Sequence, residues 1–257
     1  MNGGSAVPGI EIANVSKRYG NAHAVLESID LIVAKQEFVT LIGPSGCGKS
    51  TILKLIAGLV VPTSGAIRVD GMTPQNARET ISFVFQDAAL LPWRTVKQNI
   101  GLGLELERVA SARREIEIAA LLELVGLKNV AKSYPRELSG GMRMRVSIAR
   151  ALATSPRLML LDEPFAALDE MSRDRLNEEI LRLRSEQNWT AVFVTHSVAE
   201  AVFLSDRIVV LAPNPGRIHA EFRVELPAAR TSAVRNSEEF NTIVARVSRS
   251  LRETLRK

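Results

Sequence analysis

The chain has 257 residues, of which 46% are hydrophobic and 24% charged, and its formal net charge is +5. This composition is typical of a globular protein with one substantial core, and the single cysteine, Cys47, excludes a fold held by intrachain disulfides. No apolar run is long enough to span a bilayer and no signal peptide opens the chain, so we expect a soluble protein.

The N-terminal part of the chain contains strand-like runs. Residues 1–9 are rich in Gly, Ser and Pro, and we expect them to form a flexible segment. Strand-like composition follows at Ile10–Val15 and at Phe38–Ile42. Apolar side chains at helical spacing then predict a helix over Lys49–Leu59.

A glycine-rich turn joins that last strand to that helix. Its sequence, Gly-Pro-Ser-Gly-Cys-Gly-Lys-Ser, fits the pattern Gly-x-x-x-x-Gly-Lys-[Ser/Thr] at every defined position. Gly43, Gly46 and Gly48 permit tight turns that bring backbone N–H groups and a positive helix end to phosphate oxygens. Lys49 is then placed to reach the terminal phosphates, and the Ser50 hydroxyl to ligate Mg²⁺. An ordinary strand-to-helix turn is the alternative, and the flanking strand and helix argue against it.

The middle of the chain changes to helical character. Strand-like runs at Gly65–Asp70 and Ile81–Gln86 are followed by a block, about residues 91–152, that indicates an all-helical insertion. Its predicted helices are Val96–Leu106, Ala110–Val125 and Met142–Leu152.

A second glycine-built anion site, Leu-Ser-Gly-Gly-Met at residues 138–142, opens the last of these helices. The glycines present backbone N–H groups and a positive helix end to an anion. Because one phosphate ligand needs only one such site, the two sites together indicate half-sites and a dimer.

Strands resume in the C-terminal half, at Leu158–Leu161, Thr190–Thr195 and Arg207–Leu211, and a charged helix, Asp169–Gln187, lies between the first two. Alternation of strands and helices predicts a largely parallel sheet covered by helices. The fold class is therefore α/β.

Several polar residues end these strands. Asp162 can hold Mg²⁺, and Glu163 can orient and polarise an attacking water. His196 and Gln86 also follow strands, at the edge where open α/β sheets bind ligands. Taken alone, adjacent acids are unremarkable, and a lone histidine is more often a local hydrogen-bonding residue.

The basic charge is concentrated at the C-terminus, because residues 227–257 hold seven Arg/Lys against three Glu. Such a tail can bind nucleic acid or lie near anionic lipid. Its apolar residues nevertheless repeat at helical spacing, which favours a docked amphipathic helix with a solvated basic face. These residues are Phe240, Val244, Val247, Leu251 and Leu255.

The motifs occur in one order and at close spacings, and with them the chain resembles the ATP-binding subunit of ABC transporters from about Ile10 to Ile218. The resemblance implies a P-loop NTPase (RecA-like) α/β core with an antiparallel β subdomain and the inserted helical subdomain. The implied ATPase domain covers residues 10–226, before a basic helical extension at 227–257. The family forms a head-to-tail homodimer in which the phosphate loop of one subunit and Ser139–Gly141 of the other enclose each ATP.

The resemblance also implies residue roles. Glu163 matches the residue that acts on the hydrolytic water, His196 the sensor of the γ-phosphate, and Gln86 the link from the metal site to the helical insertion. Tyr19 matches the aromatic that stacks on adenine, and Asp169 lies in the loop that crosses the dimer interface. The implied Mg²⁺ ligands are Ser50, Gln86 and Asp162. The implied ATP-binding set is Tyr19, Gly43, Pro44, Ser45, Gly46, Cys47, Gly48, Lys49, Ser50, Thr51, Ser139, Gly140, Gly141 and Asp169.

Some positions depart from the usual family pattern. Met142 and Met144 stand where glutamines are usual, and Gln36 replaces a common turn glycine. Cys47 is either an alkylation target or simply a small residue in the turn, and we favour the second interpretation.

The resemblance to a subgroup points to import. The segments Leu138–Met142, Leu90–Trp93 and Phe203–Asp206, together with Pro215–Arg217, resemble those of importers of nitrate, aliphatic sulfonates or taurine. Related importers of pyrimidine precursors and other small organic compounds are similar at these positions. We expect a peripheral protein on the cytoplasmic face of the cell (inner) membrane, working with transmembrane permease subunits and, indirectly, a periplasmic or extracellular solute-binding protein. Leu90, Leu91 and Trp93 are either permease contacts or core residues.

The alternative is an ABC-type ATPase that acts on nucleic acid or ribosomes, which the basic charge encourages. The single cassette argues against it, as does the lack of a coiled-coil insertion and of an aromatic-rich basic stripe. We therefore expect no nucleic-acid partner.

Overall fold

The structure is a computed structural model that describes residues 7–20, 23–166, 168–227 and 230–255. The expected flexible segment 1–9 therefore lies largely outside the described residues, as do positions 228–229 and 256–257 of the expected C-terminal extension. Within the described ranges, no helix combines the length and the apolar character needed to cross a membrane.

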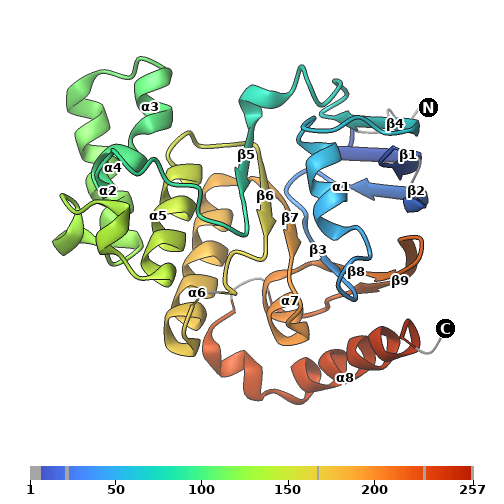
Figure 1. The fold of residues 1–257 in the computed structure, drawn as a ribbon. Coiled ribbons are helices and arrows are strands. Elements are labelled where there is room, and N and C mark those ends of the chain that lie inside the picture. Colours follow the sequence, from blue (N-terminus) through green and yellow to red (C-terminus); the bar gives the residue numbers. More distant parts are fainter. Residues whose placement is uncertain (1–6, 21–22, 167, 228–229, 256–257) are drawn as a thin grey trace, which may run out of the picture.

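The strands form two sheets (Figure 1). A three-stranded antiparallel sheet has the order β2-β1-β4, and a six-stranded sheet has the order β5-β6-β7-β3-β8-β9. The larger sheet is parallel except for the antiparallel edge strand β9, so the predicted α/β architecture is confirmed. The strands are β1 (Ile10–Arg18), β2 (Ala24–Val33), β3 (Phe38–Ile42), β4 (Ser64–Val69), β5 (Ile81–Val84), β6 (Leu158–Asp162), β7 (Thr190–Val194), β8 (Arg207–Ala212) and β9 (Arg217–Arg223).

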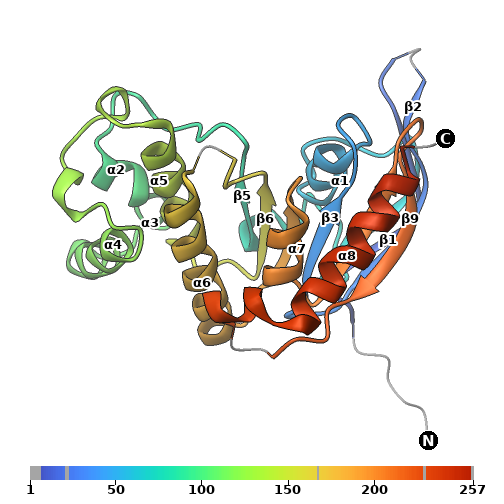
Figure 2. The same cartoon turned by 90° about the horizontal axis from the view of Figure 1, so that it is seen from below.

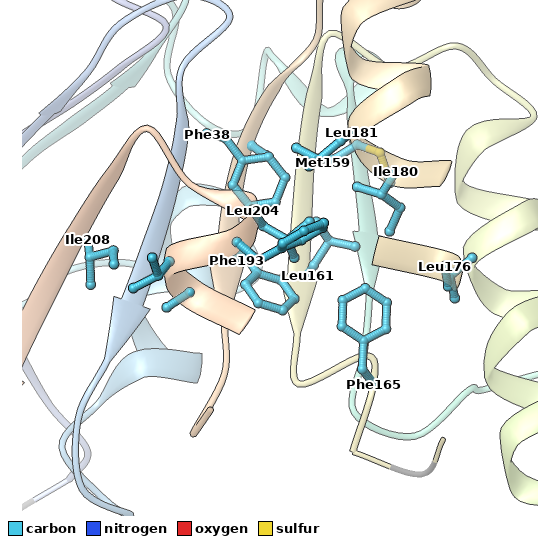
Figure 3. Packing of buried hydrophobic residues seen from close by; sticks show 14 of the residues in the cluster. Phe38, Met159, Leu161, Phe165, Leu176, Ile180, Leu181, Phe193, Leu204 and Ile208 are labelled. Carbon is cyan, nitrogen blue, oxygen red and sulfur yellow. The ribbon is translucent and has the colours of Figure 1, made fainter. Parts of the chain in front are cut away.

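The central strands β3, β6 and β7 are buried along their whole length, which explains their uninterrupted apolar sequences. Figure 3 shows Phe38 of β3 and Phe193 of β7 packed together, with ring centroids 6.0 Å apart. Phe165, in the loop after β6, packs on Phe193 at 5.4 Å. This packing anchors the loop that follows Glu163.

The helices fall into two groups. The first, α2 to α5, builds an apolar cluster of its own, and Figures 1 and 2 place α2, α3 and α4 at the end of the molecule farthest from the antiparallel sheet. The other helices pack on the sheets. The helices are α1 (Lys49–Ile56), α2 (Val96–Ile100), α3 (Leu102–Leu106), α4 (Ser111–Leu124), α5 (Gly140–Leu152), α6 (Glu170–Gln187), α7 (Val198–Leu204) and α8 (Glu238–Glu253).

Several predicted boundaries were wrong. The helix predicted over 96–106 is divided at Gly101, where a Cβ would lie 2.6 Å from Ile118 Cδ1 of α4. The helix predicted to reach Leu59 stops at Ile56, because the chain turns at Gly58 with φ +67°. The strand predicted to end at Gln86 stops at Val84. Strands β2 and β9 and helix α7 were not predicted.

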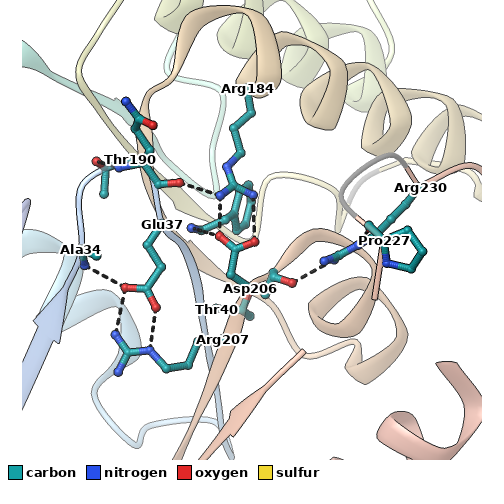
Figure 4. Close-up of polar contacts among 12 residues, drawn as sticks. Ala34, Glu37, Thr40, Arg184, Thr190, Asp206, Arg207, Pro227 and Arg230 are labelled. Atoms are coloured by element: carbon teal, nitrogen blue, oxygen red, sulfur yellow. Dashed lines mark hydrogen bonds and ion pairs between the residues drawn. The ribbon is translucent and has the colours of Figure 1, made fainter. Parts of the chain in front are cut away.

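The turn before β3 accommodates Gln36 in place of the usual glycine. Gln36 has φ +64°, a left-handed conformation that is strained for a residue with a side chain. Its N–H donates to Thr190 Oγ1 at 2.9 Å, and its carbonyl accepts from Arg184 at 2.5 Å. Arg184 is itself paired with Asp206 (Figure 4). These contacts stabilise a turn that glycine would adopt more easily.

The predicted C-terminal amphipathic helix is confirmed as α8, which buries Phe240, Ile243 and Val247 against the main core. Arg230 fastens the segment before it, because its guanidinium donates to the carbonyls of Phe203 and Ser205, both at 2.8 Å, at the end of α7. Its Nε donates to Pro227 at 2.9 Å (Figure 4). Burial lowers the pKa of Arg230.

Candidate functional site

The glycine-rich turn Gly43–Ser50, hereafter the phosphate turn, joins β3 to α1, as predicted. Helix α1 begins directly after Gly48, which has φ +92°, a conformation that favours glycine. The Lys49 ammonium reaches back over the turn and donates to the carbonyls of Gly43 at 2.7 Å and Pro44 at 3.0 Å. These are weak partners for a charged group, so phosphate oxygens can compete for the ammonium.

Close packing explains why glycines stand in and under this turn. A Cβ on Gly43 would lie 2.7 Å from both Cys47 Sγ and Leu211 O, and one on Gly48 would lie 2.4 Å from Leu26 Cδ2. Gly216, between β8 and β9, lies against the turn, because a Cβ added there would be 2.1 Å from Cys47 O. Gly46 is different: it has φ +79°, and a Cβ there would meet no atom within 4 Å. The packing fixes the inner side of the turn and leaves Gly46 on its open side.

Cys47 is a buried small residue of the turn. Burial raises the pKa of its thiol, and the nearby Lys49 only partly opposes this effect. A buried thiol with a raised pKa is a poor nucleophile. The structure therefore favours the small-residue interpretation over the alkylation target.

Ser50 and Asp162 meet where α1 begins and β6 ends. Ser50 Oγ donates to Asp162 Oδ1 at 2.9 Å. Asp162 is 6% exposed, and burial raises its pKa, with a further contribution from Glu163; the Ser50 hydrogen bond and two lysines act in the opposite direction. Because burial disfavours the ionised form of this carboxyl group, a cation bound beside it would stabilise the carboxylate.

The donor set fits Mg²⁺. Hydroxyl and carboxylate oxygens are the ligands that Mg²⁺ prefers, and the ion usually combines one or two protein ligands with substrate phosphates and water. In the described part of the chain, no group of three or more His, Cys, Asp or Glu is gathered for a metal. Ser50 and Asp162 therefore fit Mg²⁺ that arrives with a phosphate ligand.

Glu163 and His196 lie beside each other after β6 and β7. His196 Nδ1 is 3.4 Å from Glu163 Oε2, and their side chains are 68% and 23% exposed. The Glu163 N–H donates to Val194 O at 3.0 Å, which fixes the end of β6 against β7. Glu163 adopts φ +47°, a strained conformation of the kind that clusters at functional sites. A carboxylate and an imidazole at a strand edge can together orient a water or a phosphate.

Two other predicted site residues are not brought into this cluster. Gln86 is exposed in the loop after β5, and within the described residues no hydrogen bond joins it to Ser50 or Asp162. Tyr19 is 43% exposed directly after β1, and Lys17 Nζ lies 4.8 Å from its ring centroid. The Tyr19 ring is thus an available stacking surface.

The second glycine site opens α5. Ser139 caps this helix by accepting from Met142 N–H at 3.2 Å, and Gly140 beside it is exposed. Met144 is buried in the main core and Met142 packs against the helical cluster, which explains why apolar side chains are accommodated there. Figure 1 shows strands β6 and β7 between α5 and α1, and Figure 2 likewise shows β6 between these two helices. One chain therefore does not bring its two glycine sites together.

Asp169 caps α6 by accepting from Ser172 N–H at 2.9 Å, and this hydrogen bonding lowers its pKa. The residue is exposed, whereas residue 167 of the same loop lies outside the described residues. Arg145 of α5 donates to Ser172 Oγ at 2.9 Å and so joins α5 to the first turn of α6.

Arg150, at the other end of α5, holds the loop after Gln86 through the carbonyls of Ala88 at 3.1 Å and Ala89 at 2.9 Å. Sequence reasoning found neither Arg145 nor Arg150, because each contact joins distant segments. No local signal marks either arginine.

Known proteins are similar to this chain. The family model of the ABC transporter matches residues 26–166, which is more than half of the chain. The ABC transporter ATP-binding protein MJ0412 of Methanocaldococcus jannaschii is 46% identical over 229 residues, covering 87% of this chain and 85% of that protein. The aliphatic sulfonates import ATP-binding protein SsuB of Bacillus cereus is 44% identical over 232 residues, with 90% of each chain covered.

Another relative and a solved structure extend the comparison. The bicarbonate transport ATP-binding protein CmpC of Synechococcus elongatus is 44% identical over 228 residues, or 86% of this chain and 34% of that longer protein. Among solved structures, the dimeric post-hydrolysis state of the ATP-binding cassette MJ0796, bound to ADP and Pi, superposes with a TM-score of 0.78 at 32% identity. That match covers 85% of this chain and all of the other.

Proposed function

This chain belongs to the ABC transporter family, and we propose that it powers an import system for a small anionic or organic solute. It is an ATP-binding subunit that hydrolyses ATP, as its family does. The observation that carries the proposed site is the meeting of the phosphate turn with the ends of β6 and β7, where Ser50 contacts Asp162 and Glu163 contacts His196.

In this proposal each side chain has one task. Lys49 and the backbone N–H groups of Gly43 and of residues 45–51 hold the phosphates of ATP. Ser50, Asp162 and Gln86 are the residues that would hold Mg²⁺, which would neutralise phosphate charge when it is bound. Glu163 orients the attacking water and accepts its proton, and His196 contacts the γ-phosphate.

We propose that the site is completed by a second copy of the chain. The separation of α5 from α1 supports this arrangement, because Ser139, Gly140 and Gly141 then have no phosphate to bind in their own subunit. The solved neighbour described as dimeric supports it as well. Tyr19 stacks on adenine, and Asp169 crosses to the partner.

The loop after Gln86 is proposed to receive a transmembrane permease subunit at the cytoplasmic face of the membrane. Trp93 is 70% exposed there, whereas Leu90 packs against the helical cluster. Buried Asn99 holds the loop, because its side chain accepts from Leu91 N–H at 2.8 Å and donates to the Arg94 carbonyl at 3.0 Å. A fixed loop with an exposed Trp is a suitable docking point. Trp93 is therefore the proposed contact, and Leu90 a core residue.

The proposed cargo class rests on relatives. SsuB is named for the import of aliphatic sulfonates and CmpC for the transport of bicarbonate, and both cargoes are small anions. A solute-binding protein is proposed to deliver the cargo to the permease. We further propose residues 10–226 as the ATPase domain, with the helical subdomain at about 91–152 and residues 227–257 as its extension.

Copurification tests this function. The tagged full chain, isolated from detergent-solubilised membranes of its own host, is expected to bring down a polytopic membrane protein, and Trp93→Ala is expected to weaken that association. Ile116→Ala is a matched control, because Ile116 is equally exposed, at 72%, on α4. Salt-sensitive binding of duplex nucleic acid without a membrane partner would support the nucleic-acid alternative instead.

A further inference from the structure

Two loops of the proposed ATP site are joined by a chain of side chains. Thr195, directly before His196, donates from its hydroxyl to Glu200 Oε2 at 2.5 Å. Glu200 Oε1 lies 3.3 Å from Arg173 Nε. The Arg173 guanidinium also donates to Leu168 O at 3.0 Å, directly before Asp169. The connection therefore runs from the His196 loop to the Asp169 loop.

Most of this connection is buried. Thr195 is 2% exposed, the Glu200 side chain 7% and the Arg173 side chain 31%. The Nε of Arg173 makes no hydrogen bond of regular geometry, so its contact with Glu200 is an ion pair. A carboxylate at this depth needs a cationic partner, and breaking such a pair from one side leaves a buried charge alone. Loss of either Arg173 or Glu200 is therefore expected to displace the Asp169 and His196 loops.

The link joins the N-terminal ends of two helices. Asp169 caps α6, and Ser197 caps α7 by accepting from Glu200 N–H at 3.3 Å. Arg173 lies in the first turn after the α6 cap, and Glu200 in the first turn after the α7 cap. Thr195 also accepts from Ser197 N–H at 3.0 Å, so one hydroxyl holds both Glu200 and the backbone after His196.

The C-terminal segment contacts the same two helices, α6 near its beginning and α7 at its end. Besides the contacts of Arg230 with the end of α7, Arg235 pairs with Asp174 of α6 at 2.9 Å and lies over the ring of Phe203 of α7 at 4.3 Å. Because these contacts fix the two helices relative to each other, the Arg173–Glu200 ion pair determines how the Asp169 loop and the His196 loop are placed.

We propose that Arg173 and Glu200 are positioning residues that couple the Asp169 loop to His196. This inference rests on the proposed function, which places Asp169 at the partner subunit and His196 at the γ-phosphate. When the partner subunit binds and positions the Asp169 loop, the link positions His196 in turn. Hydrolysis depends on the link, whereas ATP binding to the phosphate turn does not.

The test compares kcat and KM for ATP in the full chain. Glu200→Gln and Arg173→Met are each expected to lower kcat at least about tenfold while KM changes less than about threefold, since the link acts on geometry after ATP binds. The double variant is expected to be no slower than either single variant, because both substitutions break the same link. Glu186→Gln, which breaks the exposed Arg182–Glu186 pair of α6, is the matched control and keeps wild-type kcat.

Variants of Thr195 keep the inference testable if a substitution of the buried pair prevents folding. Thr195→Val preserves shape and removes the hydroxyl, so it is expected to reproduce the loss of kcat. Thr195→Ser keeps the hydroxyl donor and is expected to retain turnover close to that of the wild type. Equal kcat for the Val and Ser variants would overturn the inference.

A spectroscopic measurement separates positioning from general stabilisation. The imidazole ¹⁵N signals of His196 are expected to shift in Glu200→Gln, while those of His219, on β9, stay in place. Unchanged His196 signals together with unchanged kcat would refute the coupling.

His196→Ala distinguishes the two levels of the argument. If His196→Ala retains wild-type turnover, the proposed role of His196 fails, and the coupling inferred from it fails with it. If His196→Ala abolishes turnover while Glu200→Gln and Thr195→Val do not lower it, the proposed function stands and the coupling alone is wrong.

Discussion

The hydroxyl of Ser50 donates a 2.9 Å hydrogen bond to Oδ1 of Asp162, joining residues that are 112 positions apart in the chain. This contact brings the phosphate turn to the end of β6. A hydroxyl and a carboxylate are ligands that Mg²⁺ prefers, and these two residues would hold the ion in the proposed ATP site.

Asp162→Asn is expected to raise the stability of the nucleotide-free protein while lowering its ATP turnover. Burial raises the pKa of Asp162, so the folded state binds its proton more tightly than the unfolded state does. The free energy of unfolding therefore falls as pH rises from the ordinary pKa of an aspartate, which applies in the unfolded state, to the raised pKa of the folded state. At neutral pH the nucleotide-free variant should therefore melt at a higher temperature than the wild type, as scanning calorimetry can show.

The same variant is expected to lose function. Turnover of ATP should fall roughly 100-fold, because a charged ligand of the metal site has been removed. Added MgADP should stabilise the wild type more than the variant. A variant with a lower melting temperature and normal magnesium dependence would contradict the assignment of Asp162.

Glu163→Gln is expected to keep ATP binding and lose hydrolysis by at least about 100-fold, because an amide cannot accept the proton of the attacking water. With hydrolysis blocked, the ATP-bound dimer should accumulate, which sedimentation with and without ATP can measure. Glu170→Gln, at the exposed start of α6, is the matched control for a nearby loss of charge. Unchanged turnover in Glu163→Gln would exclude the catalytic role.

Tyr19→Ala is expected to weaken ATP binding about five- to tenfold, and Tyr19→Phe to retain it, because stacking needs the ring and not the hydroxyl. Titration calorimetry with ADP gives the affinities. Tyr134→Ala is the control, since Tyr134 is similarly exposed and also lies beside a cation, Arg136 at 5.8 Å. Equal affinities of Tyr19→Ala and the wild type would place adenine elsewhere.

Alkylation of Cys47 is expected to be slow in the native protein, because the thiol is buried and its raised pKa lowers the thiolate fraction at any given pH. The rate should rise with pH and increase strongly in denaturant. Mass spectrometry after timed treatment with a maleimide measures it. Rapid native labelling at neutral pH would show that the phosphate turn opens readily.

Residues with strong local patterns were predictable. The apolar runs of β3, β6 and β7 identified buried parallel strands, and glycine spacing identified the two turns that are proposed as anion sites. Strand β2 did carry a signal, because buried Ile29, Leu31 and Val33 alternate with exposed positions, but exposed Ile32 weakens the contrast. Helix α7 has only seven residues, too few for a clear helical period.

Contacts between distant segments that carry no recognisable motif were not predictable. Arg173 and Glu200 are ordinary charged residues of two helices, and nothing in their local sequence marks them as partners. Their pairing depends on how α6 packs beside α7, which in turn depends on the core and on the C-terminal segment. The phosphate turn needed no such information, because its chemistry is encoded in eight consecutive residues.

Mixed dimers test the central claim, that each ATP is enclosed by two chains. Lys49→Ala disables the phosphate turn and Ser139→Arg disables the second glycine site, so each variant alone is expected to be inactive. Differently tagged variants, coexpressed and purified by both tags, are expected to recover ATP turnover, because one composite site then has neither substitution. A mixed dimer that stays inactive, while a subunit carrying both substitutions leaves one working site when paired with the wild type, would show that each site lies within a single chain.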